Sequence, residues 1–348
     1  MAVHRQLVAV TGGSGFIATH IIIALMNQGY RVRTTLRRLD RTDEVRSMLA
    51  QGGAAEPETV ETVQADLTSD DNWDQAVDGA TYVIHVASPT PATRPRGEAE
   101  MVSMAVGGVT RVMTAAKAAR VRRVVLTSAS GAIIAGHKRH PDLFTEEDWT
   151  NLNGRIDAYQ RSKTVAERAA WQFSANEDLP LAVVNPVAVM GPVLGADFSH
   201  SNQIIQSMLS GKMPYLLRLG FDYVDVRDVA DLHLLAMTRP EAVGQRFIAT
   251  SGQNLTYLEE ATILKDNLGT AARRVSTKEV PDLVVRLLAP FSPTLRMPAT
   301  FLGRNTACSN EKARALLGWR PRSGEEAILA TAKSLVELGL VGAGAKRR

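Results

Sequence analysis

The sequence is poor in cysteine and aromatic residues, and it has no long apolar run. Cys308 is the only cysteine among 348 residues, which excludes an intramolecular disulfide and a cysteine-based zinc cluster. Aromatic residues make up 5%, so a stacking surface for nucleic acid is not expected. No stretch reaches the roughly 20 apolar residues that span a bilayer, and residues 1–6 lack the pattern of a signal peptide. We expect a cytoplasmic protein with neither a nucleic-acid nor a membrane partner.

The charge balance is nearly even once the end of the chain is set aside. The sequence has 40 basic and 36 acidic residues, a formal net charge of +4. Three of the basic residues, at 346–348, close a Gly/Ala-rich segment, 341–348, that we predict to be a disordered basic tail. Without these three, 37 basic residues face 36 acidic ones, and the even balance does not favour a nucleic-acid partner.

Short β-branched runs alternate with helix-length stretches through the first half of the chain. Strands are predicted at 7–11, 32–36, 60–64, 82–86, 124–127 and 181–184. Helices are predicted between them at 16–28, 41–50, 70–77, 99–119 and 157–175. Because each right-handed crossover must cover the sheet, this alternation predicts an α/β fold with a doubly wound parallel sheet of the Rossmann type.

The alternation stops after residue 186, where a stretch marked by Gly and Pro begins. A helix from Val226 to Pro240 and a strand at 246–249 return to the sheet. The other predicted elements are a helix at 202–210, a loop to Asp222, and helices at 281–288, 310–317 and 325–338. We assign 1–186 with 224–250 to a dinucleotide-binding domain and 187–223 with 251–340 to a smaller substrate-binding cap. The cleft between them is the expected ligand site.

A glycine-rich turn joins the first predicted strand to the first predicted helix. Gly12 permits the tight turn, Gly15 lets the backbone approach a pyrophosphate, and Ala18 lets the helix pack closely on the strand. The amino end of the helix then offers free N–H groups and a positive dipole to the anion. This position favours dinucleotide binding, although such a turn can also serve packing alone. The residues expected to touch the cofactor are Gly12, Gly13, Ser14, Gly15, Phe16 and Ile17.

The end of the second predicted strand indicates which dinucleotide is bound. An acidic residue there binds the ribose of NAD, whereas an arginine accommodates the 2′-phosphate of NADP. This strand ends in Arg37 and Arg38, with Arg41 close behind, so NADP(H) is favoured over the alternative of a solvated surface pair. Asp66 and Leu67, after the third strand, are expected near the adenine, unless Asp66 instead caps the helix that follows.

Tyr159 and Lys163 form the main catalytic candidate. Four residues apart at the start of a predicted helix, they lie one turn apart on the same face. A tyrosine hydroxyl has an ordinary pKa of about 10, and a nearby ammonium lowers it by favouring phenolate. Tyr159 is therefore a candidate general acid. An exposed polar pair is the alternative, but the glycine turn upstream favours catalysis.

These motifs resemble those of the extended short-chain dehydrogenase/reductases. Further matching motifs are Asp66-Leu67, 85–89, Asn185-Pro186 and 225–230. Within that family, the chain is similar to the branch of dihydroflavonol 4-reductases, cinnamoyl-CoA reductases and microbial aldehyde and ketone reductases. The resemblance extends over roughly residues 5 to 340.

The resemblance implies roles for several residues. NADPH would donate the hydride and Tyr159 the proton, while Lys163 would bind the nicotinamide ribose and lower the pKa of the tyrosine. Further cofactor contacts are implied for Val86, Ala87, Ser88, Pro186, Val187, Val189 and Ser201.

The sequence departs from this family at the end of the fifth predicted strand. The family usually has Thr-Ser-Ser there, and its second serine binds the substrate carbonyl. In this chain Ala129 stands at that position, between Ser128 and Ser130. A local twist after the strand would turn one of these hydroxyls into the site, and we expect Ser128 first and Ser130 next. If neither reaches, Tyr159 alone donates to the developing alkoxide.

Other residues receive less specific assignments. His85, within the fourth predicted strand, is expected to be a core histidine. Acidic clusters such as 146–148 lack partner histidines at metal spacing, so no metal site is expected. The residues expected to line the substrate pocket are Ser88, Met190, Pro192, Tyr223, Phe291 and Met297.

The leading hypothesis is NADPH-dependent, reversible reduction of a small aldehyde or ketone with an apolar or aromatic side, by a monomer or homodimer. A sugar-nucleotide epimerase or dehydratase of the same superfamily is a second hypothesis, but it would keep NAD bound, which Arg37 and Arg38 disfavour. A third is a non-catalytic dinucleotide-sensing module. The missing second serine slightly favours that module, whereas the presence of Tyr159 and Lys163 disfavours it.

Overall fold

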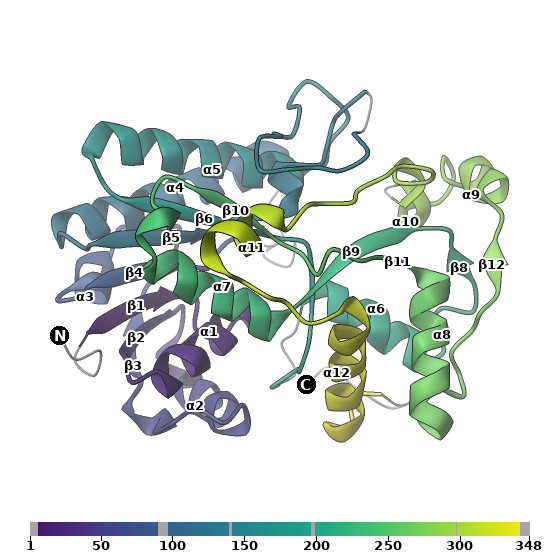
Figure 1. Cartoon of the computed structure of the whole chain (residues 1–348), viewed down its shortest axis with the longest axis horizontal. Helices are drawn as coiled ribbons and strands as arrows, with labels where there is room; N and C mark the ends of the chain where they lie inside the picture. Colours follow the sequence, from purple (N-terminus) through teal and green to yellow (C-terminus); the bar gives the residue numbers. More distant parts are fainter. Residues whose placement is uncertain (1–5, 90–96, 139–140, 196–198, 297, 342–348) are drawn as a thin grey trace.

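The computed structural model describes residues 6–89, 97–138, 141–195, 199–296 and 298–341. Its main feature is a seven-stranded parallel sheet with helices on both faces (Figure 1). The strand order is β10-β6-β5-β4-β1-β2-β3. The strands are β1 (Leu7–Thr11), β2 (Arg31–Leu36), β3 (Glu61–Gln64), β4 (Tyr82–His85), β5 (Arg123–Thr127), β6 (Leu181–Pro186) and β10 (Arg246–Ala249). The predicted α/β fold with a doubly wound Rossmann sheet is confirmed.

Two apolar layers cover the sheet because the side chains of each strand alternate between its faces. Val10 of β1 joins the layer beneath α1, α2 and α7, whereas Ala9 joins the layer beneath α3, α4 and α5. These helices are α1 (Phe16–Asn27), α2 (Thr42–Gln51), α3 (Trp73–Val77), α4 (Glu98–Ala118), α5 (Ala158–Glu177) and α7 (Val226–Thr238).

The second half of the chain builds a smaller cap beside this sheet (Figure 1). The cap contains a three-stranded sheet in the order β11-β9-β7 and a two-stranded sheet of β12 and β8. Its elements are β7 (Ala188–Met190), α6 (His200–Leu209), β8 (Leu216–Leu217), β9 (Gly220–Asp225), β11 (Asn254–Thr256), α8 (Tyr257–Leu268), β12 (Glu279–Val280), α9 (Asp282–Leu288), α10 (Pro293–Arg296) and α12 (Gly324–Glu337). By contrast, α11 (Glu311–Leu317) packs into the apolar layer of α1 and α7, although it lies within the predicted cap range.

Several elements differ from the sequence predictions. The predicted loop to Asp222 contains β8 and the start of β9, and β7, β11 and α8 were not predicted. The sequence patterns missed these strands because β7, β8 and β11 are short and because β9 pairs with strands far along the chain. The third helix starts at Trp73 instead of residue 70, because Asn72 has a left-handed backbone (φ 63°). The basic tail at 342–348 lies outside the described residues.

Polar side chains from two helices hold the segment that follows β7. Thr331 Oγ1 of α12 accepts the N–H of Gly191 at 2.7 Å, and Ser334 Oγ accepts the N–H of Val193 at 2.8 Å. From the other side, His20 of α1 donates from Nε2 to the carbonyl oxygen of Pro192 at 2.9 Å. The segment 191–193 is therefore fixed between α1 and the helix α12 of the cap.

Within the described ranges, no helix is long and apolar enough to cross a bilayer.

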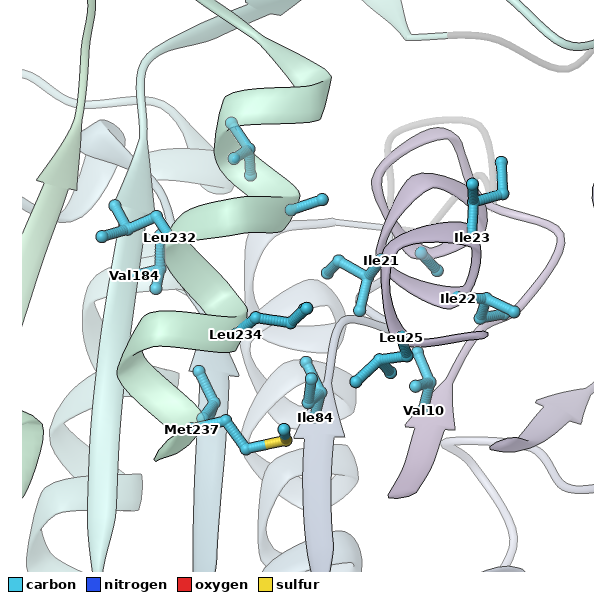
Figure 2. Packing of buried hydrophobic residues seen from close by; sticks show 14 of the residues in the cluster. Val10, Ile21, Ile22, Ile23, Leu25, Ile84, Val184, Leu232, Leu234 and Met237 are labelled. Atoms are coloured by element: carbon cyan, nitrogen blue, oxygen red, sulfur yellow. The ribbon is translucent and has the colours of Figure 1, made fainter. Parts of the chain in front are cut away.

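Leu25→Ala is expected to lower the free energy of unfolding by about 2–5 kcal/mol, because the truncation removes apolar contacts and leaves a cavity. Leu25 is 0% exposed and lies beside Val10 and Ile84 (Figure 2). Urea denaturation measures the change. In the control Leu39→Ala, at a leucine that is 45% exposed, the change is expected to stay below about 0.5 kcal/mol. Equal losses in the two variants would contradict the packing described.

Candidate active site

The glycine turn lies at the carboxyl end of β1, in close contact with β2 and with the segment that follows β4. Gly12 has a left-handed backbone (φ 76°), and a Cβ atom there would lie 3.1 Å from Ala87. A Cβ atom at Gly13 would lie 2.2 Å from Thr34 Oγ1. Gly12 and Gly13 donate their N–H groups to Thr35 at 3.0 and 3.1 Å. The turn is thus closed on β2 and on the segment after β4 by contacts that require glycine.

The first turn of α1 leaves its backbone N–H groups available. Gly15 precedes the helix and is exposed, and in this described segment no side chain caps the helix. The first turn carries no acidic residue, and Phe16 and Ile17 within it are half-buried. Such an amino end is suited to a phosphate anion. Beside it, Arg41 donates to Ser14 Oγ at 3.2 Å.

Three arginines follow the end of β2. Arg41 makes a bidentate pair with Glu44, with both contacts at 2.7 Å. Arg38 is exposed and pairs with Asp40. Arg37 is exposed and forms no ion pair with another described residue. Its guanidinium is therefore available to an anion at this strand end.

Asp66 does not cap the next helix. Its Oδ1 accepts hydrogen bonds from the N–H of Thr68 at 2.8 Å and from Thr68 Oγ1 at 2.7 Å. Burial alone would raise the pKa of Asp66, but the Thr68 bonds and the guanidinium of Arg37 outweigh it, so this pKa lies below its usual value. Leu67 is half-buried and packs against Gly108 of α4. Asp66 and Arg37 therefore lie near each other at the ends of β3 and β2.

Thr11, the last residue of β1, connects the glycine turn to the end of β4. Its Oγ1 accepts the N–H groups of Val86 and Ala87, each at 3.0 Å, and lies 2.8 Å from His85 Nδ1. Burial, with Lys163 nearby, lowers the pKa of His85 to about 3, so its neutral ring accepts the threonine proton. His85 is a core histidine, as expected. Sequence reasoning missed Thr11, because one threonine at a strand end forms no motif.

A capping box fixes the start of α5. Asp157 Oδ1 accepts the N–H of Gln160 at 2.7 Å, and Gln160 Oε1 accepts the N–H of Asp157 at 3.1 Å. Tyr159 and Lys163 lie on the next turns, with Lys163 Nζ 6.0 Å from the centre of the Tyr159 ring. Lys163 also donates to the carbonyl oxygen of Thr127, the last residue of β5, at 3.4 Å. The capping box therefore fixes where Tyr159 and Lys163 lie at the edge of the sheet.

Burial governs the titration of this pair. It raises the pKa of Tyr159 to about 12, and Asp157 adds to the rise. It lowers the pKa of Lys163 to about 8, against the opposing effect of Glu167. Loss of hydration dominates the pKa of the tyrosine, and the ammonium of Lys163 lies 6.0 Å from the ring centre, so the lowering of this pKa by Lys163 stays a prediction. At neutral pH the phenol keeps its proton and most of the lysine is charged.

The two candidate serines have different surroundings. Ser128 is 5% exposed, and its Oγ donates to Glu167 at 2.6 Å, so this hydroxyl is committed to a buried carboxylate. Ser130 begins a 3-10 turn and is half-buried, and its hydroxyl has no hydrogen bond to another described residue. A Cβ atom at Gly131 would lie 3.7 Å from Tyr159 Cε1. The turn that carries Ser130 therefore adjoins the tyrosine.

The remaining cofactor candidates lie in or after β4 and β6. Those at the strand ends are Val86, Ala87, Ser88, Pro186 and Val187. Because the carboxyl ends of parallel strands share one edge, these five lie at the same edge as the glycine turn. Val189 is 7% exposed within β7, and Ser201 is half-buried in the first turn of α6.

Two predicted substrate-pocket residues are buried in the cap core. Met190 and Tyr223 are 0% and 1% exposed, and the Tyr223 hydroxyl donates to Glu260 of α8. They lie on the neighbouring strands β7 and β9, whose side chains pack in the apolar cluster with α8 and α12. Neither side chain is open to solvent in this structure, and their place in a substrate pocket stays a prediction. The other predicted lining residues are Ser88 and Pro192, which are half-buried, Phe291, which is 86% exposed, and Met297, which lies outside the described residues.

A cavity of about 20 Å³ lies between β4, β5 and α5. The polar side chains in its wall are His85, Ser88, Thr127, Ser128, Lys163 and Glu167. Sequence reasoning missed Glu167, although its position four residues after Lys163 puts a carboxylate on the same helix face. A larger cavity of about 580 Å³, lined mainly by residues 308–320, shares no residue with this site. In the part of the chain that is described, no cluster of His, Cys, Asp or Glu is arranged to hold a metal.

Comparison with known proteins shows several similar chains. A family model described as "NAD dependent epimerase/dehydratase family" matches residues 8–249. Cinnamoyl-CoA reductase 1 of Arabidopsis thaliana is 35% identical over 253 residues, which cover 72% of each chain. Dihydroflavonol 4-reductase of Zea mays is 30% identical over 273 residues, which cover 76% of this chain and 75% of that one. The crystal structure of yeast methylglyoxal/isovaleraldehyde reductase Gre2 complexed with NADPH has a TM-score of 0.77 and 26% identity, and covers 96% of this chain and 99% of that one.

Thr11→Val is expected to lower Tm by several degrees, because a valine of the same shape leaves the N–H groups of Val86 and Ala87 without their acceptor. An unsatisfied buried donor costs about 1–3 kcal/mol. Differential scanning fluorimetry measures the change, with Thr11→Ser, which keeps the hydroxyl, as the control. A valine variant that melts at or above the serine variant would contradict the assigned role of the hydroxyl.

Proposed function

Because the chain belongs to the NAD dependent epimerase/dehydratase family, we propose that it is an NADPH-dependent reductase of aldehydes and ketones, reversible as an alcohol dehydrogenase. The observation that carries this proposal is the position of Tyr159 and Lys163 at the end of β5, on the same sheet edge as the glycine turn. The strands β5, β4 and β1 are adjacent and parallel. The reductases among the relatives support this activity.

The residues of the glycine turn fit a dinucleotide. Gly12 and Gly13 allow the turn to close on its neighbours, Gly15 leaves its backbone exposed, and the uncapped amino end of α1 suits a pyrophosphate. At the end of β2, Arg37 holds the 2′-phosphate that distinguishes NADPH from NADH, and Arg41 lies over Ser14. The Gre2 structure, which contains NADPH, supports the choice of cofactor.

When bound, NADPH supplies a hydride to the carbonyl carbon. Tyr159 donates its phenolic proton to the carbonyl oxygen, and burial, which raises its pKa to about 12, keeps that proton in place at neutral pH. The ammonium of Lys163 then balances the charge of the phenolate. Ser130 donates a second hydrogen bond to the same oxygen, in place of the serine missing at 129, since Ser128 is bound to Glu167.

The substrate we propose is a small carbonyl compound with an apolar or aromatic side. Ser88 and Pro192 are the lining residues that remain accessible, and His20 fixes Pro192 through its carbonyl oxygen. We also propose that the protein is cytoplasmic and acts as a monomer or a homodimer.

The proposed domains are 1–186 with 224–250 for the larger one and 187–223 with 251–340 for the cap. The helix α11 is moved from the cap to the larger domain.

Tyr159→Phe is expected to lower kcat for NADPH oxidation by at least about 100-fold across a panel of aldehydes and ketones, because general acid catalysis contributes about 10²–10⁴-fold. Binding of NADPH, followed by fluorescence titration, is expected to persist. The matched control is Tyr215→Phe, at a tyrosine that is 59% exposed, which is expected to keep the wild-type rate. Full activity of the Tyr159→Phe variant would refute the assigned acid.

Arg37→Ala is expected to raise the Kd for NADPH about tenfold and to leave the Kd for NADH unchanged, because a hydrogen bond to a charged group contributes about 1.5–3 kcal/mol. Isothermal titration calorimetry measures both constants. Arg31→Ala, at the other end of β2, is the control and is expected to change neither. Equal weakening of both cofactors by Arg37→Ala would exclude the phosphate contact. NAD retained through purification would instead favour an epimerase.

A further inference from the structure

A buried carboxylate lies on α5 directly after the Tyr–Lys pair. Glu167 is 1% exposed and accepts hydrogen bonds from side chains of two strands, of the residue after a third strand and of its own helix. The donors are Ser128 Oγ, directly after β5, at 2.6 Å, Asn185 Nδ2 of β6 at 2.8 Å, Arg246 Nε of β10 at 2.5 Å and Trp171 Nε1 of α5 at 3.3 Å. Glu167 therefore joins the catalytic helix to three strand ends.

The polar cluster around Glu167 holds α5 on the sheet at a high desolvation cost. Removing a carboxylate and a guanidinium from water costs several kcal/mol for each ion, and apolar side chains of similar volume often stabilise a fold equally well. The compensation is incomplete, because Asn185 Oδ1 and Arg246 Nη2 are buried without a hydrogen-bond partner in the described part of the chain. Stability alone does not explain why a charge stands at Glu167.

The carboxylate and the lysine of the proposed catalytic pair line the same small cavity. Glu167 and Lys163 both line the cavity of about 20 Å³, a volume close to that of one water molecule. The β4 side contributes His85, which is neutral, and α4 contributes only apolar residues, Ala105 and Val109. Arg246 pairs with Glu167 from β10. Among the described residues that line this cavity, Glu167 is the carboxylate, and it acts electrostatically on the ammonium of Lys163.

We propose that Glu167 is a positioning residue for the reaction, because its carboxylate anchors α5 to the ends of β5, β6 and β10 and balances the charge of Lys163 across the cavity. This inference rests on the proposed reductase function. Burial lowers the pKa of Lys163 to about 8, and Glu167 acts in the opposite direction. Removing the negative charge therefore lowers the pKa of the lysine further.

The test is Glu167→Gln, which keeps the size of the side chain and removes its charge. Because the reaction needs the lysine charged, the rate falls as pH rises through the pKa of Lys163. In the variant this fall is expected about one pH unit lower than in the wild type, the smallest shift typical of a lost opposite charge. The matched control is Glu146→Gln, which removes another buried carboxylate beside Arg246, one that accepts the N–H of Ile248 and does not line the cavity.

The control is expected to leave the pH profile in place, whatever it does to Tm. A Glu167→Gln variant that folds and keeps the wild-type profile would overturn the proposal and leave Glu167 a structural residue. An equal shift in both variants would overturn it too, because the effect would then not depend on the cavity.

A second readout does not use activity. The ¹³Cε resonance of Lys163, assigned by its loss in Lys163→Met, is titrated by NMR without cofactor, and the same downward shift is expected in Glu167→Gln. Should that variant not fold, Glu167→Asp replaces it, since it withdraws the carboxylate by one methylene group and is expected to give a smaller downward shift. An unchanged titration overturns the proposal. Wild-type protein that reduces no carbonyl compound would reject the proposed function alone, because the titration still tests Glu167.

Discussion

Close backbone contacts at the carboxyl edge of the sheet are the constraint on which the site depends. A methyl group at Gly13 would lie 2.2 Å from Thr34 Oγ1, and one at Gly12 would lie 3.1 Å from Ala87. Thr11 then binds the two N–H groups that follow β4, so this segment cannot withdraw to admit a larger side chain. The contacts that close the fold at this edge also leave the bare backbone and free helix end that a dinucleotide requires.

Loss of hydration determines the pKa values of Tyr159 and Lys163 on α5. Burial works against charge in both directions, so it raises the pKa of Tyr159 to about 12 and lowers that of Lys163 to about 8. A phenol that holds its proton suits the reductive direction of the proposed reaction, in which it would donate that proton. The ammonium has its main effect only after the transfer, when a phenolate stands beside it. In the proposed reaction the ammonium stabilises the phenolate left by the transfer, which is equivalent to lowering the pKa of the tyrosine against the opposing effect of burial.

Local patterns predicted the large sheet and the residues whose spacing is set within one element. β1 and β5 are covered on both faces, so they form continuous apolar runs. Tyr159 and Lys163 were recognisable because one helix fixes their spacing. By contrast, β9 was missed because its partners, β7 and β11, lie in distant segments. The direction of Ser128 and the burial of Tyr223 likewise depend on remote carboxylates, at 167 and 260, that no local pattern contains.

Polar groups attach the cap to the helices of the large sheet, and one of them, His20, is sensitive to pH. Burial lowers the pKa of His20 to about 4, below its ordinary value of 6.5, so the ring is neutral when it donates to Pro192. A histidine with a lowered pKa contributes its stability above the unfolded value and loses it as the pH falls towards about 4. On the same interface, Asp228 of α7 pairs with Arg322, just before α12. Because His20 lies on the helix that starts at the glycine turn, its bond to Pro192 links the segment 191–193 to that helix.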